Sequence, residues 1–100
     1  LEKLEICGDF NQRLENVEWP VSLAILILGR GFNQPVDRVK WPVSLVDLSL
    51  GPNFNHPIDC VRWPASLKIL GVATGFKYSL EEAKRRGIRV FRGLSYSDTE

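Results

Sequence analysis

Apolar residues recur along this chain in a short motif, L-x-x-L-x-L, whose last part places apolar side chains at every second position. The motif occurs at one spacing, starting at Leu23, Leu45 and Leu67, and the third copy has Val72 in the place of the last leucine. Because successive side chains of a β-strand point to opposite faces, this alternation predicts a short strand in each copy. Leu4 and Ile6 fit the same frame after Leu1, so the pattern predicts four strands.

The residues around these strands repeat every 22 positions. The repeated columns are Phe10, Phe32, Phe54 and Phe76, then Asn11, Asn33 and Asn55, then Val17, Val39 and Val61, then Trp19, Trp41 and Trp63, then Ser22, Ser44 and Ser66. A fixed period of about 20–50 residues is typical of stacked units that cannot bury their apolar sides alone. The sequence therefore predicts a repeat solenoid, mainly β, in which coils of 22 residues stack and their strands form a parallel sheet.

The connections between the predicted strands carry turn residues. Gly29-Arg30-Gly31 and Gly51-Pro52-Asn53 each follow a strand, and we expect turns with positive φ there. The stretch from Val36 to Val39 has apolar residues three apart, which fits either an extended chain or one tight helical turn. Both alternatives stay open.

The repeated side chains have structural explanations. The Trp and Phe columns are expected to stack in the interior, where aromatic rings fill the space inside a coil. The Asn column is expected to satisfy backbone groups at a buried corner, since an amide offers both a donor and an acceptor. The Ser column is expected to form local hydrogen bonds at the entrance of each strand.

The last quarter of the chain leaves the 22-residue register. Ser79 and Glu82 form a capping box ahead of about two helical turns, and Gly87 fits the position after the helix end. Alternating apolar residues beyond it predict a final strand that extends to Leu94. We therefore expect repeats over residues 1–76, a C-terminal helix–strand cap over 77–94 and a tail over 95–100.

Composition adds little to this picture, and candidate chemistry is sparse. The 100 residues carry 13 Lys and Arg against 12 Asp and Glu, a formal net charge of +1, which favours neither nucleic acid nor an anionic membrane as a partner. His56 is the only histidine, and neither Cys7 nor Cys60 has a partner residue at a catalytic, disulfide or metal-binding spacing. The sequence therefore predicts a protein that is not an enzyme and needs no cofactor or metal.

Two features of the sequence bear on cellular location. No apolar run approaches the roughly 20 residues of a membrane span. Two cysteines without a disulfide pattern favour a reducing compartment and hence a cytoplasmic location. The chain begins with Leu1 and contains no Met, which suggests a segment of a longer polypeptide.

The repeat also resembles a known family. Residues 41–57 read W-P-x-S-L-x-x-L-x-L-G-x-x-F-N-H-P, which is similar to the FNIP repeat, a 22-residue relative of the leucine-rich repeats named for Phe-Asn-Ile-Pro. Two features depart from the family pattern, because Trp41 stands where Leu is usual and His56 stands where the motif has Ile. The resemblance covers residues 1–76. It implies a curved, leucine-rich-repeat-like coil that contacts other proteins, sometimes attached to an F-box or kinase domain.

The side chains between the inward leucines are the candidate binding surface. We name them the ladder face, which consists of Lys3, Glu5, Ile25, Ile27, Asp47, Ser49 and Ile69. These positions vary from coil to coil, and their isoleucines are expected to be exposed apolar groups near charges, which is typical of a protein contact. We expect a non-catalytic protein–protein interaction scaffold that binds a protein or larger complex there and takes no small-molecule substrate.

Two alternative functions stay open. In the first, the stack is a structural subunit or spacer of a larger assembly, because an uncapped first coil would expose a strand edge and core. In the second, a cationic segment over residues 84–92 binds nucleic acid or another anion weakly. Its cationic residues are Lys84, Arg85, Arg86, Arg89 and Arg92. Cations that complement a helix dipole explain part of this segment without any ligand.

Overall fold

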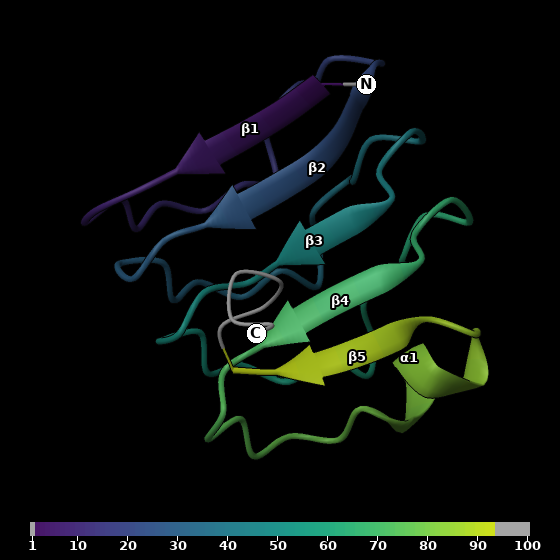
Figure 1. Cartoon of the computed structure of the whole chain (residues 1–100). Coiled ribbons are helices and arrows are strands. Elements are labelled where there is room, and N and C mark those ends of the chain that lie inside the picture. Colours follow the sequence, from purple (N-terminus) through teal and green to yellow (C-terminus); the bar gives the residue numbers. More distant parts are fainter. Residues whose placement is uncertain (1, 94–100) are drawn as a thin grey trace.

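Five parallel strands form one sheet in the computed structural model of the chain, which describes residues 2–93 (Figure 1). In chain order they are β1 (Glu2–Ile6), β2 (Leu23–Leu28), β3 (Asp47–Ser49), β4 (Ile69–Val72) and β5 (Arg89–Arg92). Neighbours in the sequence are neighbours in the sheet, because one coil carries the chain from the end of each strand to the start of the next. The prediction of a mainly β repeat solenoid with a parallel sheet is confirmed. Leu94 and the tail over 95–100 lie outside the described residues.

The strand pairing keeps the 22-residue step of the sequence through the middle of the sheet. Ile25 pairs with Asp47 and Asp47 pairs with Ile69, so equivalent positions of successive coils lie side by side. β5 joins after a step of 20 residues, since Ile69 pairs with Arg89. Between β4 and β5 lies the helix α1 (Glu81–Arg85), which completes the helix–strand unit expected at this end.

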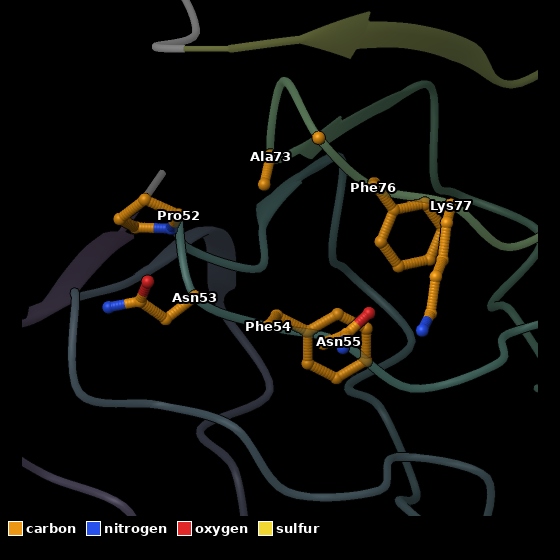
Figure 2. Close-up of a pocket in the computed structure, with 8 residues that line it drawn as sticks. Pro52, Asn53, Phe54, Asn55, Ala73, Phe76 and Lys77 are labelled. Atoms are coloured by element: carbon orange, nitrogen blue, oxygen red, sulfur yellow. The ribbon is translucent and has the colours of Figure 1, made fainter.

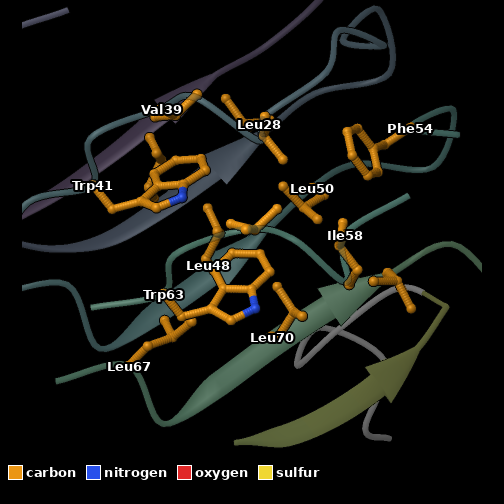
Figure 3. Close-up of a cluster of buried hydrophobic side chains, with 14 of the residues drawn as sticks. Leu28, Val39, Trp41, Leu48, Leu50, Phe54, Ile58, Trp63, Leu67 and Leu70 are labelled. Atoms are coloured by element: carbon orange, nitrogen blue, oxygen red, sulfur yellow. The ribbon is translucent and has the colours of Figure 1, made fainter. Parts of the chain in front are cut away.

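The inward side chains of the strands form a continuous apolar core (Figure 3). Leu26, Leu48 and Leu70 lie side by side in β2, β3 and β4 and are each 0% exposed. Full burial of one leucine contributes about 1.5–3 kcal/mol, so these equivalent positions supply much of the stability of the stack. Leu4 in β1 differs and is 38% exposed, because no coil of the described chain covers its other side.

The aromatic columns stack inside the coils, which confirms the prediction. Successive rings have centroids 6.0 Å apart in the column Phe32, Phe54 and Phe76, and 6.2 to 6.3 Å apart in the column Trp19, Trp41 and Trp63. Trp41 and Trp63 lie near the start of the strands, and Phe54 lies near their ends (Figure 3). The three indole N–H groups are buried and have no hydrogen-bond partner within residues 2–93. The Trp column is therefore held by ring packing rather than by hydrogen bonds.

An asparagine ladder joins successive coils at one corner. The backbone N–H of Asn33 donates to Oδ1 of Asn11 at 2.8 Å, and the N–H of Asn55 donates to Oδ1 of Asn33 at 2.9 Å. The expectation that these amides satisfy backbone groups is confirmed. The expected burial is wrong, because all three asparagines are exposed. Within the sheet, a backbone carbonyl of the neighbouring strand accepts a hydrogen bond from each such N–H. At this corner the side chain of an asparagine supplies the acceptor instead.

Asn33→Ala is expected to lower the free energy of unfolding by about 1 kcal/mol, because it leaves the N–H of Asn55 without its acceptor. Asn33→Asp is the matched control, since a carboxylate keeps an oxygen in the same place. The free energy of unfolding should fall less in this variant than in Asn33→Ala. Urea denaturation followed by tryptophan fluorescence measures both variants. Equal losses would show that this hydrogen bond contributes nothing to stability.

The serines link neighbouring coils instead of bonding locally. Oγ of Ser44 donates to the carbonyl of Leu23, and Oγ of Ser66 donates to the carbonyl of Leu45, each at 2.6 Å. The acceptor lies 21 residues back in the chain. The local prediction is wrong because the adjacent coil, only about 4.8 Å away, brings its carbonyl within reach of the hydroxyl.

The corners after the strands use glycine in two ways. Gly51 has a φ of +90°, as predicted, and an added Cβ would lie 2.5 Å from the carbonyl oxygen of Gly29. Gly29 and Gly31 do not have positive φ, so the prediction is wrong there. Close approach of the preceding coil explains the glycine instead, because a Cβ on Gly29 would lie 2.7 Å from the carbonyl oxygen of Ile6.

The back of each coil is a single turn in an otherwise extended chain. The N–H of Val39 donates to the carbonyl of Val36 at 3.2 Å, and the N–H of Val61 donates to the carbonyl of Ile58 at 3.3 Å. No helix forms in these stretches. All four side chains are buried, so the turn directs both of its apolar residues into the core.

The helix α1 has five residues and is shorter than the two turns expected. Oγ of Ser79 accepts a hydrogen bond from the N–H of Glu81 at 3.2 Å, but the predicted capping box does not form. Gly87 has a φ of +83°, and its N–H and that of Ile88 donate back to carbonyls of the helix. This Schellman arrangement confirms the predicted helix end. Ala83 faces the core and fixes α1 against the stack.

Candidate partner-binding surface

The ladder face forms two parallel rows of side chains across the sheet. Strand pairing places Lys3, Ile25, Asp47, Ile69 and Arg89 in one row, and Glu5, Ile27, Ser49, Gly71 and Phe91 in the other. All residues predicted for this face therefore lie beside their counterparts in the adjoining coils. Since neighbouring strands are about 4.8 Å apart, a partner segment laid across the rows would contact several coils at once.

The isoleucines of the ladder face are less exposed than the sequence predicts. Ile25, Ile27 and Ile69 are half-buried, as are Asp47 and Ser49. Each of these residues has a paired residue on both sides in the same row. Except for Gly71 beside Ser49, which has no side chain, these neighbours cover its flanks. The middle of the face is therefore a mixed apolar and polar surface of half-buried groups rather than a line of protruding side chains.

Charged groups lie at both ends of the ladder face. In β1, Nζ of Lys3 is 3.2 Å from Oε2 of Glu5, and both side chains are about half exposed. In β5, the guanidinium of Arg89 lies 5.8 Å from the centroid of the Phe91 ring, which is a cation–π distance. Exposed ion pairs of this kind contribute only about 0–1 kcal/mol to stability. Their charges therefore affect the choice of partner more than they affect folding.

The sequence does not predict the surface positions of two pairs of residues. Arg89 and Phe91 continue the rows of the ladder face, and Phe91 is 43% exposed. The 22-residue period does not predict their positions in these rows, because β5 joins the sheet after a step of 20 residues. Val21 and Val43 are 83% and 80% exposed and hold equivalent positions before β2 and β3. Their signal is the apolar residue that follows W-P in each copy.

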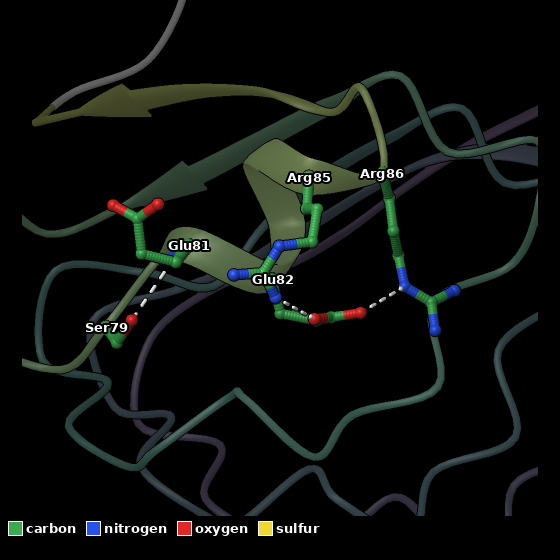
Figure 4. A network of polar contacts seen from close by, with 5 residues as sticks. All are labelled: Ser79, Glu81, Glu82, Arg85 and Arg86. Carbon is green, nitrogen blue, oxygen red and sulfur yellow. Dashed lines mark hydrogen bonds and ion pairs between the residues drawn. The ribbon is translucent and has the colours of Figure 1, made fainter.

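The helix α1 and the residue after it carry three of the predicted anion-binding cations, and an acid neutralises part of their charge. Oε1 of Glu82 is 3.0 Å from Nη1 of Arg85, and Oε2 is 3.2 Å from Nε of Arg86 (Figure 4). The hydrogen bond from Arg86 is the main cause that lowers the pKa of Glu82; desolvation opposes it, and Arg85 adds to it. The ionised carboxylate of Glu82 forms ion pairs with both Arg85 and Arg86, while Lys84 is exposed.

The other two predicted cations lie elsewhere. Nη1 of Arg92 donates to the carbonyl of Phe76 at 2.8 Å, so this guanidinium serves the fold. Arg89 lies in the ladder face beside Phe91. The structure thus divides the cationic segment over residues 84–92 among three environments and does not gather it on one surface.

A shallow depression of about 300 Å³ lies at a corner of the last coils, outside the predicted surfaces (Figure 2). Its lining residues are Pro52, Asn53, Phe54, Asn55, Ala73, Gly75, Phe76 and Lys77. Gly75 stands where Asn53 carries an amide one coil earlier, so no side chain fills this space. Lys77 is the one ionisable residue of the lining, with no acid, histidine or thiol beside it there. The depression therefore holds no acid–base pair or nucleophile for catalysis.

The histidine and the two cysteines do not form a site together. Nε2 of His56 is 3.1 Å from the carbonyl of Asn33, the role that Gln34 has one coil earlier. A carbonyl only accepts, so Nε2 carries the proton in this contact. Cys7 and Cys60 are both free and exposed. In the part of the chain that the structure describes, no group of three or more His, Cys, Asp or Glu residues could hold a metal ion.

Within residues 2–93, no helix has the length and hydropathy to cross a membrane. A scan against protein-family models and a search of curated proteins each found no match to the chain.

Proposed function

We propose that the chain is a non-catalytic protein–protein interaction module that binds a protein partner, or a larger complex, on the ladder face. The observation that carries this proposal is the apolar strip made by Ile25 and Ile27 in β2 and Ile69 in β4, with Asp47 of β3 between them. The sheet holds these groups at a fixed spacing. A partner therefore meets a preformed surface and binds with little loss of conformational entropy in this chain.

The charges of the ladder face suggest the chemistry of the partner. Asp47 lies at the centre of one row, and Arg89 lies at its end. A complementary partner would carry an apolar strip with an acid opposite Arg89, since matched potentials favour the correct register.

Ile27→Lys is expected to weaken partner binding at least about tenfold, because it places a charge in the apolar strip. Val43→Lys is the matched control, since Val43 is 80% exposed at the corner before β3 and is not part of the ladder face. Both variants and the unmodified chain are immobilised and exposed to an extract of the cells that make the protein, and retained proteins are quantified by mass spectrometry. Near-ultraviolet circular dichroism verifies the fold.

The two variants distinguish the surfaces directly. Partners that are lost with Ile27→Lys and kept with Val43→Lys support the ladder face. Retention of every partner by Ile27→Lys would refute it, and loss only with Val43→Lys would assign binding to the exposed corner valines.

The remaining expectations concern location, family resemblance and two alternative functions. We infer a cytoplasmic location because Cys7 and Cys60 are free and exposed, which suits a reducing compartment. The resemblance to FNIP and leucine-rich repeats stays a prediction that agrees with a binding role. A structural subunit or spacer of a larger assembly is the first alternative. Weak anion binding has less support, because Glu82 occupies two of the arginines, and it predicts affinity that falls steeply with salt.

A further inference from the structure

The depression between the corners that follow β3 and β4 is open because Gly75 has no side chain (Figure 2). We name it the corner depression; its volume is about 300 Å³. The fold does not require this glycine, because its φ is not positive and nothing lies within 4 Å of an added Cβ. A glycine that the fold does not need costs conformational entropy, and close approach of a ligand is one reason for its presence.

The loss of a side chain at Gly75 also leaves a backbone acceptor without its donor. One coil earlier, Nδ2 of Asn53 donates at 2.6 Å to the carbonyl of Arg30. The equivalent carbonyl in the next coil belongs to Pro52, which lines the corner depression. Because glycine has no amide side chain, this carbonyl receives no hydrogen bond from residues 2–93.

The asparagine ladder ends in the same depression. The N–H of Asn55 donates to Oδ1 of Asn33 at 2.9 Å, but the N–H of Lys77 makes no equivalent bond to Asn55 in the described part of the chain. Nε2 of His56 is 3.1 Å from the carbonyl of Asn33, whereas Tyr78, which takes its place in the next coil, makes no such contact among the described residues. Oδ1 and the carbonyl oxygen of Asn55 are therefore both available to a donor.

One cation lies beside these oxygens. Lys77 is exposed and forms no ion pair with any residue from 2 to 93. Its Nζ lies 5.5 Å from the centroid of the Tyr78 ring, and Figure 2 shows its side chain extending toward Asn55. The corner depression thus combines three oxygen acceptors with one positive charge.

This combination limits the chemistry of a ligand. A metal ion or an ammonium group would be repelled by Lys77. A simple inorganic anion would pair with Lys77 but would bring few donors to the three oxygens. A ligand that satisfies both carries hydroxyl groups, which donate, together with one anionic group. Pro52 and Ala73 add apolar surface to the lining, which suits the C–H face of a sugar ring.

We propose that the corner depression binds a sugar acid, a polyhydroxylated molecule with one carboxylate, as a ligand rather than as a substrate. Its hydroxyl groups donate to the carbonyl of Pro52 and to the two oxygens of Asn55, and its carboxylate pairs with Lys77. The site is separate from the ladder face and does not rest on the proposed function.

Titration of the ¹⁵N-labelled chain with D-galacturonate, followed by NMR, tests the site. The side-chain amide of Asn55 and the backbone N–H groups of Gly75 and Lys77 are expected to shift together. D-Galactose has the hydroxyl groups without the carboxylate, and acetate has the carboxylate without the hydroxyl groups. Each should bind at least about tenfold more weakly than galacturonate. Equal binding of acetate would show a site for an adventitious anion only and would overturn the proposal.

Two variants separate the parts of the site. Lys77→Gln should reduce the affinity for galacturonate to that for galactose and leave galactose binding unchanged. Gly75→Asn copies the corner of the preceding coil, so its amide should fill the depression, bond to the carbonyl of Pro52 and weaken galacturonate binding at least about tenfold. Thr74→Asn is the matched control, since Thr74 is exposed beside the depression and is not part of its lining.

The source of the sugar acid is tested with trigalacturonate. Tighter binding than that of the monosaccharide assigns the site to a sugar acid within a glycan, and equal binding assigns it to the free sugar acid. Galacturonate that shifts none of the lining signals, or that binds Gly75→Asn as well as the unmodified chain, overturns the proposal. The spectra of the variants verify their fold. No protein partner is present, so the outcome is independent of binding on the ladder face.

Discussion

Phe54→Ala is expected to lower the free energy of unfolding by about 3–5 kcal/mol. Phe54 is 2% exposed and stacks between Phe32 and Phe76, with 6.0 Å between ring centroids on each side. The substitution therefore removes apolar burial and leaves a cavity in contact with two other coils. Because each coil of a solenoid contacts only its neighbours, a defect at a middle coil weakens the stack on both sides of it.

Urea denaturation monitored by tryptophan fluorescence measures this loss. Phe91→Ala is the matched control, because Phe91 is 43% exposed at the edge of the sheet and the same substitution should cost less than about 1 kcal/mol there. A domain of this size is stabilised by roughly 5–15 kcal/mol in total, so Phe54→Ala removes a large part of it. Similar losses for both variants would contradict the view that the Phe column is a central support of the stack.

The fold could be predicted because the repeat itself carries the tertiary contacts. In a stack of equal coils, residues 22 positions apart lie next to each other, so a column in the sequence becomes a column in space. Phe32 and Phe54 illustrate this for packing, and Asn33 and Asn55 illustrate it for hydrogen bonding. The candidate surface follows from the same frame, since the residues between the inward leucines must point outward.

Predictions that depend on the distance between coils were less accurate. Ser44 was expected to bond within its own coil, but the carbonyl of Leu23 in the adjacent coil is its acceptor. Ile25 and Ile27 were expected to be exposed, yet neighbours in the same rows cover their flanks. Close lateral contact between coils causes both differences, and a pattern along one chain does not give that contact directly.

The cationic segment illustrates a different limit. Counting charges over residues 84–92 predicts a patch, but the helix brings Glu82 within 3.2 Å of Arg86, and the strand directs Arg92 to the carbonyl of Phe76. Helical spacing alone could have identified the ion pairs of Glu82, since side chains three and four residues apart lie on one face. The hydrogen bond from Arg92 to the carbonyl of Phe76 depends on how the last coil folds back, and no spacing in the sequence predicts it.

Gly51→Ala is expected to lower the free energy of unfolding by about 3 kcal/mol or more, because two separate costs add. The φ of +90° is one that side chains with a Cβ rarely adopt. The added Cβ would also lie 2.5 Å from the carbonyl oxygen of Gly29 and 2.8 Å from that of Leu28. Both atoms belong to the backbone of the preceding coil, so they cannot move aside without separating the coils.

Three further glycines allow the two costs to be measured separately by urea denaturation. Gly8 has a φ of +74° with nothing within 4 Å of an added Cβ, so Gly8→Ala should show the conformational cost alone, about 1 kcal/mol. Gly29→Ala should show the steric cost alone, because its φ is not positive and its Cβ would lie 2.7 Å from a carbonyl oxygen. Gly75→Ala has neither cost and should stabilise the chain by about 0.4–1 kcal/mol. If Gly51→Ala costs no more than Gly8→Ala, the coils can separate easily at this corner, and the close contact between them is not what requires glycine.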